Sequence, residues 1–156
     1  MIRGAGAPNY LDAANSVYVS GSYAYVASVE DDSLSIFNVS DPAKPKLAGV
    51  VRGAGAPYYL DWAWSVYVSG SYAYVASYLD NSLSIFNVSD PTNPKLAGVV
   101  HGAGTPNHLY GADSVYVSGS YAYVVSCLGC SLSIFQVTEG SSTHHKNRYN
   151  KVNNRI

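Results

Sequence analysis

The two cysteines are the residues of this sequence best suited to metal binding or redox chemistry. They form the segment Cys127-Leu-Gly-Cys130, and a Cys-x-x-Cys segment can be a redox pair or half of a metal site. No second segment of this kind exists, and His108 is the only further ligand expected on the same side of the fold. We therefore predict that no metal is bound. Because the cysteines flank a two-residue turn, they either close a small disulfide or remain free thiols.

Acidic and histidine side chains are the other groups that could support catalysis or cation binding. None of the four histidines forms a recognisable triad with serine and aspartate, because almost every serine occupies a repeated strand or turn position. Six acids could supply oxygen ligands to Ca²⁺, although their spacing matches no known loop motif. They are Asp12, Glu30, Asp31, Asp32, Asp61 and Asp80. The sequence predicts a protein that is not an enzyme and holds no cofactor.

A third group combines aromatic rings with carboxylates in the middle of the chain. The candidate ligand-binding residues are Tyr58, Tyr59, Asp61, Trp62, Trp64 and Tyr78. Aromatic faces beside carboxylates suit sugar rings, and they suit protein contacts as well. Trp62 and Trp64 are two residues apart, so they could instead extend a strand and pack against a neighbouring unit. Packing or assembly, a protein contact and glycan binding all stay open for this group.

An internal repeat defines the strands and loops that carry these candidate residues. Gly4, Gly53 and Gly102 each open a Gly-Ala-Gly-x-Pro segment at a spacing of 49 residues. Residues 4–51 and 53–100 differ at only eight of 48 positions, and the third copy follows from Gly102 to about residue 137. A period near 50 residues is typical of a solenoid, a propeller or an array.

Each repeat has the alternation of β-strands rather than of helices. In the first copy, strands are expected over residues 16–19, 23–28, 34–39 and 46–51. Tight turns join them, which requires antiparallel pairing, and the third strand is apolar on both faces, as in a sheet packed between two neighbours. We predict an all-β fold of tandem four-stranded antiparallel β-propeller blades, three per chain. The blades occupy residues 1–139 (about 4–51, 53–100 and 102–139), before a basic polar tail, 140–156.

The differences between the first two copies concentrate on one end of the predicted sheet. Six of the eight fall in the loop that leads into the first strand or in the turn between the second and third strands. In a meander these two connections emerge at the same end. Because loops on a rigid scaffold usually carry function, we expect any ligand to bind at this rim.

The repeat resembles the LVIVD repeat family. The resemblance is carried by Ser-Tyr-Ala-Tyr-Val-Ala-Ser and by Ser-Leu-Ser-Ile-Phe-Asn-Val-Ser-Asp-Pro-Thr-Asn-Pro-Lys-Leu-Ala-Gly (82–98). It covers residues 16–51, 65–100 and 114–137, and it implies β-propeller blades in bacterial or archaeal cell-surface proteins without an assigned activity. An extracellular or cell-surface location follows from the resemblance alone, since the chain shows no signal peptide. The third copy departs from the family by losing its Asp-Pro-x-x-Pro segment and fourth strand.

Three blades are fewer than the four to eight of closed propellers. Both flanks of the repeat array are unfinished, and an open edge or face favours pairing with another chain. The expected partner is therefore a second copy, in a six-bladed two-chain ring or a head-to-tail filament. A fragment of a larger protein is the alternative interpretation.

Charge and short motifs add weaker expectations. Up to residue 139 there are five basic and ten acidic residues, whereas 140–156 hold four basic residues and no acid. The acidic body argues against nucleic-acid binding, and no apolar run approaches the 18 residues of a membrane span. Asn38-Val-Ser and Asn87-Val-Ser are glycosylation sequons, although the repeat also explains them structurally.

Overall fold

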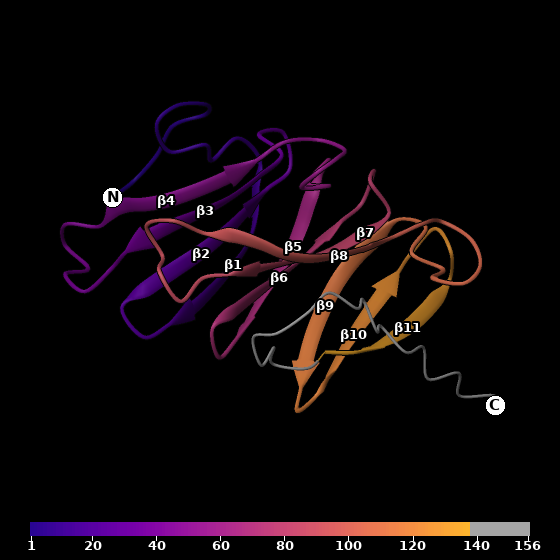
Figure 1. Cartoon of the computed structure of the whole chain (residues 1–156). Coiled ribbons are helices and arrows are strands. Elements are labelled where there is room, and N and C mark those ends of the chain that lie inside the picture. Colours follow the sequence, from indigo (N-terminus) through magenta and orange to yellow (C-terminus); the bar gives the residue numbers. More distant parts are fainter. Residues whose placement is uncertain (138–156) are drawn as a thin grey trace.

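The computed structural model describes residues 1–137, and their regular structure consists of eleven β-strands (Figure 1). The first sheet contains β1 (Ala14–Ser20), β2 (Tyr23–Ser28), β3 (Ser33–Asn38) and β4 (Lys46–Arg52). The second contains β5 (Ala63–Ser69), β6 (Tyr72–Ser77), β7 (Ser82–Asn87) and β8 (Lys95–His101). The third contains β9 (Ala112–Ser118), β10 (Tyr121–Ser126) and β11 (Ser131–Gln136).

Each sheet is an antiparallel meander in which strands consecutive in sequence pair with one another. The predicted all-β architecture of repeated antiparallel units is confirmed, and we call the sheets blades 1, 2 and 3. Blade 3 has three strands within the described residues. The position expected for its fourth strand and the basic tail, 140–156, lie outside the described residues. No helix of a length and apolarity that could cross a membrane occurs in the part of the chain that the structure describes.

Several strand boundaries differ from the prediction by one or two residues, and two of the differences have a clear local cause. The innermost strand of blade 1 begins at Ala14 instead of residue 16, because a β-bulge between Ala14 and Ser16 lets the ladder continue. The third strand spans Ser33–Asn38, so Val39 lies outside it. There the Asn38 side-chain oxygen accepts a hydrogen bond from the N–H of Ser40 at 3.0 Å, which turns the chain away from the ladder.

The blades stack face to face, with the innermost strands β1, β5 and β9 next to one another. We call trailing the face that each blade turns to the next blade, and leading the face that it turns to the preceding one. On the trailing face of blade 1, Tyr25, Ala27, Leu34 and Ile36 are buried against the leading face of blade 2. The equivalent residues of blade 2 are buried against blade 3. These two clusters supply the hydrophobic stabilisation of the array.

The two outer faces of the array lack such a neighbour within residues 1–137. On the leading face of blade 1, Val17 is 64% exposed, whereas Val66 at the same position of blade 2 is 5% exposed. On the trailing face of blade 3, Leu132 is 61% exposed, whereas Leu34 is fully buried. Figure 1 shows why, since the blades follow one another from the N-terminal to the C-terminal side without meeting again.

Candidate functional site

The loop rim is the end of the blades that carries the connecting loops (4–13, 53–62 and 102–111) and the hairpin turns (29–32, 78–81 and 127–130). Serines hold these loops to the third strand of each blade. The hydroxyl of Ser84 donates to the carbonyl oxygen of Tyr58 at 2.8 Å, and that of Ser35 donates to Asn9 at 3.0 Å. Loops and turns thus emerge at one end, as predicted, and the repeated serines have a structural role.

An aspartate clamps the connecting loop in blades 1 and 2, and it is buried in blade 1 and half-buried in blade 2. The Asp31 carboxylate accepts hydrogen bonds from the N–H groups of Gly6 at 3.1 Å and Asp12 at 2.8 Å. Asp80 does the same for its own loop, with distances of 2.9 and 2.8 Å. Blade 3 has Gly129 at this position and therefore lacks the clamp. Asp31 and Asp80 were both considered as Ca²⁺ ligands, and their carboxylates instead hold backbone N–H groups.

Three of the six candidate ligand-binding residues meet in one aromatic cluster. The ring centroids of Trp62 and Trp64 are 6.2 Å apart, and that of Tyr78 lies 5.8 Å from Trp62 and 5.5 Å from Trp64. Trp64 lies in β5, not in the loop, because it is the extra residue of the bulge between Ala63 and Ser65. All three side chains are half-buried and pack on one another.

The other three candidates lie apart from this cluster. Tyr58 packs on Phe86 at a centroid distance of 6.3 Å, while Tyr59 stacks on His101 at 4.5 Å with ring planes 14° apart. The carboxyl of Asp61 has a pKa above its usual range, first because of burial and then because of the charges of Asp32 and Asp80. Sequence reasoning therefore grouped residues that the structure divides between loop packing and the aromatic cluster.

Both cysteines are exposed at the loop rim and are free thiols in the structure. The thiol of Cys130 points to the carbonyl oxygen of Cys127 at 3.6 Å. The pKa of Tyr78 is raised by burial and then by a hydrogen bond with the side chain of Cys127. Within residues 1–137, no three histidine, cysteine or acidic side chains gather as metal ligands would. Disulfide formation between the cysteines stays a prediction.

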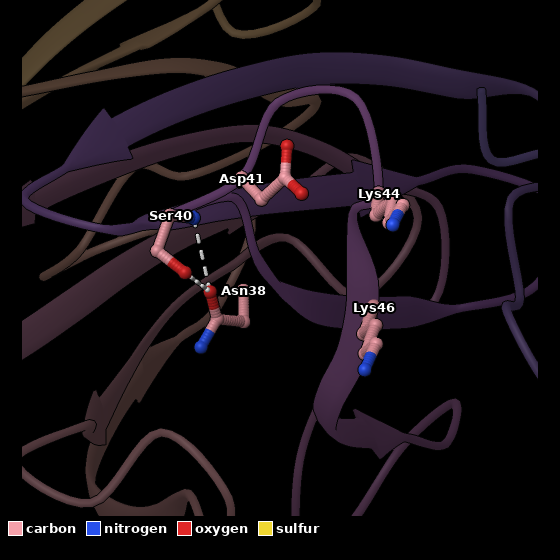
Figure 2. A pocket seen from close by; sticks show the side chains of 5 residues that line it. All are labelled: Asn38, Ser40, Asp41, Lys44 and Lys46. Atoms are coloured by element: carbon pink, nitrogen blue, oxygen red, sulfur yellow. Dashed lines mark hydrogen bonds between the residues drawn. The ribbon is translucent and has the colours of Figure 1, made fainter.

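The two sequons occupy equivalent hollows at the opposite end of blades 1 and 2. The side-chain oxygen of Asn38 accepts hydrogen bonds from both the N–H and the hydroxyl of Ser40, at 3.0 and 2.7 Å. Figure 2 shows this pair with Asp41, Lys44 and Lys46 around a hollow of about 200 Å³. Asn87 and Ser89 repeat the geometry in blade 2. The motif forms an Asx turn, and its glycosylation stays a prediction.

A tyrosine ladder along the innermost strands was missed by sequence reasoning. The rings of Tyr18 and Tyr67 are 4.7 Å apart, and those of Tyr67 and Tyr116 are also 4.7 Å apart. Hydrogen bonds with both neighbours raise the pKa of the central Tyr67. The Val-Tyr-Val segment at the 49-residue spacing was the signal in the sequence. At the open end of the ladder, Tyr116 is 59% exposed.

Polar contacts across each blade boundary accompany the apolar clusters. The side-chain oxygen of Asp32 accepts a hydrogen bond from the N–H of Trp62 in the next blade at 3.0 Å. Asn81 accepts in the same way from the N–H of Gly111 at 2.8 Å. In addition, the hydroxyl of Ser16 accepts from the N–H of Val66 at 3.2 Å, and a serine repeats this contact at the second boundary. Each boundary is thus a repeated apolar and polar interface.

The repeat that builds this interface matches an established family model. LVIVD repeats match residues 13–52, 62–101 and 111–149. The chain belongs to the LVIVD repeat family. The third LVIVD repeat extends to residue 149 and so includes the segment in which the Asp-Pro-x-x-Pro motif is lost. No curated protein shows significant sequence similarity to the chain.

Solved structures share the fold of this LVIVD repeat protein at low sequence identity. A protein of unknown function from Desulfotomaculum acetoxidans superposes with a TM-score of 0.62 at 17% identity, over 80% of this chain and 39% of its own. A putative 6-phosphogluconolactonase from Bacteroides fragilis gives 0.61 at 16%, over 74% and 32%. Hydrazine synthase from Kuenenia stuttgartiensis gives 0.58 at 18%, over 77% and 32%. The likeness shows a propeller-like fold alone, and this chain spans two fifths or less of each.

Proposed function

We propose that this LVIVD repeat protein is a non-catalytic extracellular or cell-surface structural module whose copies associate head to tail. The observation that carries the proposal is the match between its two outer faces. The leading face of blade 1 and the trailing face of blade 3 are built from the same residue positions that pack together at both internal blade boundaries. The location rests on the family resemblance.

The apolar part of this match supplies the driving force. Val17 and Val19 are 64% and 61% exposed on the leading face, where Val66 and Val68 of blade 2 are buried. Burying a valine or leucine side chain fully stabilises an association by about 1.5–3 kcal/mol. On the trailing face Leu132 offers the complementary surface. Association of two copies would bury both faces at once.

The polar groups of the two faces are complementary as well. At the internal boundaries a serine hydroxyl accepts the N–H of the valine one blade further on. On the outer faces the equivalent acceptor is Ser114, which is exposed, and the equivalent donor is the N–H of Val17. The exposed ring of Tyr116 would likewise stack on Tyr18 of a second copy and continue the tyrosine ladder.

The number of blades favours a closed ring of two copies. Two chains supply six blades, within the range of four to eight seen in closed propellers, and their contact has twofold symmetry. Three chains would supply nine. Where the rotation between copies does not close, the same contact generates a filament.

The test measures the solution mass of the wild-type chain and of variants in which one of the two outer faces is blocked. Wild type is expected above its monomer mass of 16.6 kDa by light scattering, with rings or filaments seen by electron microscopy. Val17→Lys and Leu132→Lys each block one face, so each variant alone is expected to be monomeric. A mixture of the two keeps one intact face from each and is expected to form a two-chain complex. A folded wild type that stays at 16.6 kDa at high concentration would refute the proposal.

The Trp62–Trp64–Tyr78 cluster favours a second candidate, a lectin-like or protein-binding rim. The three rings meet at the loop rim. Aromatic faces suit sugar rings, and they suit protein contacts as well. Replacing both tryptophans by alanine separates the functions. Loss of glycan-array binding with unchanged mass supports the lectin, whereas glycan binding that persists in the double variant refutes it, because the outer faces that carry association lie on blades 1 and 3.

A further inference from the structure

The hairpin turns of blades 1 and 2 each reach across to the next blade through one side-chain oxygen. Asp32 accepts the N–H of Trp62 at 3.0 Å, and Asn81 accepts the N–H of Gly111 at 2.8 Å. The donors occupy equivalent positions in successive connecting loops. This hydrogen bond is therefore a fixed part of the blade boundary at the loop rim.

In blade 3 the acceptor position is occupied by Cys130. The three residues share a left-handed backbone, with φ of 48° at Asp32, 51° at Asn81 and 46° at Cys130. Their side chains therefore leave the turn in the same direction. Cys130 is exposed, and so is Leu132 on the trailing face beside it.

The matching donor stands at the other end of the array. Ala13 is the counterpart of Trp62 and Gly111, with φ of 50°, 55° and 69° in the three loops. Both of those residues donate their N–H to the preceding blade. The N–H of Ala13 has no hydrogen-bond partner within residues 1–137.

Building on the head-to-tail association proposed above, we infer that Cys130 belongs to the docking surface and receives the N–H of Ala13 from a second copy. The thiol sets the strength of this contact, and any group attached to it blocks docking. The side chain of Cys127 hydrogen-bonds with Tyr78 of the preceding blade, so the proposed contact is assigned to Cys130.

The chemistry of sulfur explains why this contact would be weaker than the two internal ones. A cysteine sulfur is a weak hydrogen-bond acceptor, whereas carboxylate and amide oxygens are strong ones. Asparagine and aspartate also tolerate the left-handed conformation better than other non-glycine residues. Cysteine at position 130 thus lowers both acceptor strength and local backbone fit relative to Asp32 and Asn81.

The test measures the dissociation constant of the reduced full chain by sedimentation. Cys130→Asn restores the acceptor that Asn81 provides, and it is expected to tighten association about twofold to tenfold, the range of one neutral hydrogen bond. Cys130→Gly is the matched control, because it relieves the left-handed backbone without providing an acceptor. It is expected to bind no tighter than wild type. Iodoacetamide alkylates a cysteine thiolate, which displaces iodide and forms a thioether. This added group is expected to weaken wild-type association at least about tenfold, as overpacking of an interface does.

The outcomes separate this inference from the proposed function. Cys127→Ser combined with Cys130→Asn removes both thiols, so its association is expected to be unaffected by iodoacetamide. If wild type associates but neither Cys130→Asn nor alkylation changes the dissociation constant, the inference fails and head-to-tail association stands. If wild type is monomeric and Cys130→Asn associates, the inference is supported, since the thiol then limits docking. If both remain at 16.6 kDa, both proposals fail.

Discussion

Gly49 and Pro91 lie in contact across the boundary between blades 1 and 2. A Cβ atom on Gly49 would collide with the carbonyl oxygen of Pro91, and it would lie 3.1 Å from the ring of Pro94. The loop Asp-Pro-x-x-Pro of one blade therefore packs on the outermost strand, β4, of the preceding blade. The two family motifs, Leu-Ala-Gly and Asp-Pro-x-x-Pro, are the two sides of one interface.

Replacing Gly49 by alanine is the most direct perturbation of this contact. The added methyl group meets backbone, which cannot rotate away, so the loop or the strand must shift. We expect Gly49→Ala to lower the free energy of unfolding by about 1–3 kcal/mol, as overpacking does. Urea denaturation followed by circular dichroism measures the change. Gly104→Ala is the control, since a Cβ there has no atom of the described residues within 4 Å. An equal loss in both variants would contradict the assignment.

Leu60 and Leu11 occupy the same loop position in different surroundings. Leu60 is fully buried between blades 1 and 2, whereas Leu11 is half-buried on the leading face of blade 1. Leu60→Ala is expected to cost about 2–5 kcal/mol of folding stability. Leu11→Ala is expected to cost less stability and to weaken self-association. Denaturation and sedimentation on both variants measure the two effects, and equal stability losses with unchanged association would count against the outer-face assignment.

Asp61 makes stability depend on pH in a predictable direction. Its pKa is raised above the unfolded value, chiefly by burial, so the ionised carboxylate destabilises the folded chain at neutral pH. This penalty disappears as the pH falls below the unfolded value of about 3.9. Asp61→Asn is therefore expected to raise Tm at about pH 7 and to have no effect near pH 3.

The matched control for this change is Asp12→Asn, at the same position of blade 1. Asp12 is exposed, and exposed substitutions usually change stability by less than about 0.5 kcal/mol. Scanning calorimetry of both variants at the two pH values gives the comparison. A Tm increase for Asp61→Asn that persists undiminished at the acidic pH would show that its carboxylate charge is not the cause.

The architecture was predictable from sequence because the same pattern of strands and turns occurs three times in the chain. The 49-residue period, the alternation within 23–28 and the Gly-containing turns fix strand order, pairing and the shared rim. The aromatic cluster was predictable only in part. Trp64 joins Trp62 because a bulge turns it toward the rim, and bulges depend on backbone pairing that no local pattern specifies.

Contacts between blades could not be predicted, because they join residues 30 to 50 positions apart. Asp31 and Asp32 are neighbours in sequence and equal in charge. Asp31 clamps its own loop, whereas Asp32 binds the N–H of Trp62 in the next blade. Only the stacking of sheets separates these roles. The role proposed for Cys130 likewise depends on structure, because it rests on the contacts that Asp32 and Asn81 make at the same position of blades 1 and 2.

The tyrosine ladder provides the last prediction, since Tyr67 has another blade packed beyond it, whereas Tyr116 has none within residues 1–137. Tyr67 lies between two rings, each 4.7 Å away, whereas Tyr116 has a ring on one side and is 59% exposed. Aromatic pairs contribute about 0.5–1.5 kcal/mol beyond their buried area. Tyr67→Ala is expected to destabilise the single chain by breaking both pairs. Tyr116→Ala breaks one internal pair, and it also removes the ring that would stack on Tyr18 of a second copy. Its effect on self-association, measured by sedimentation, is therefore expected to exceed that of the exposed, off-ladder control Tyr110→Ala. Equal dissociation constants for Tyr116→Ala and Tyr110→Ala would show that the ladder ends at Tyr116.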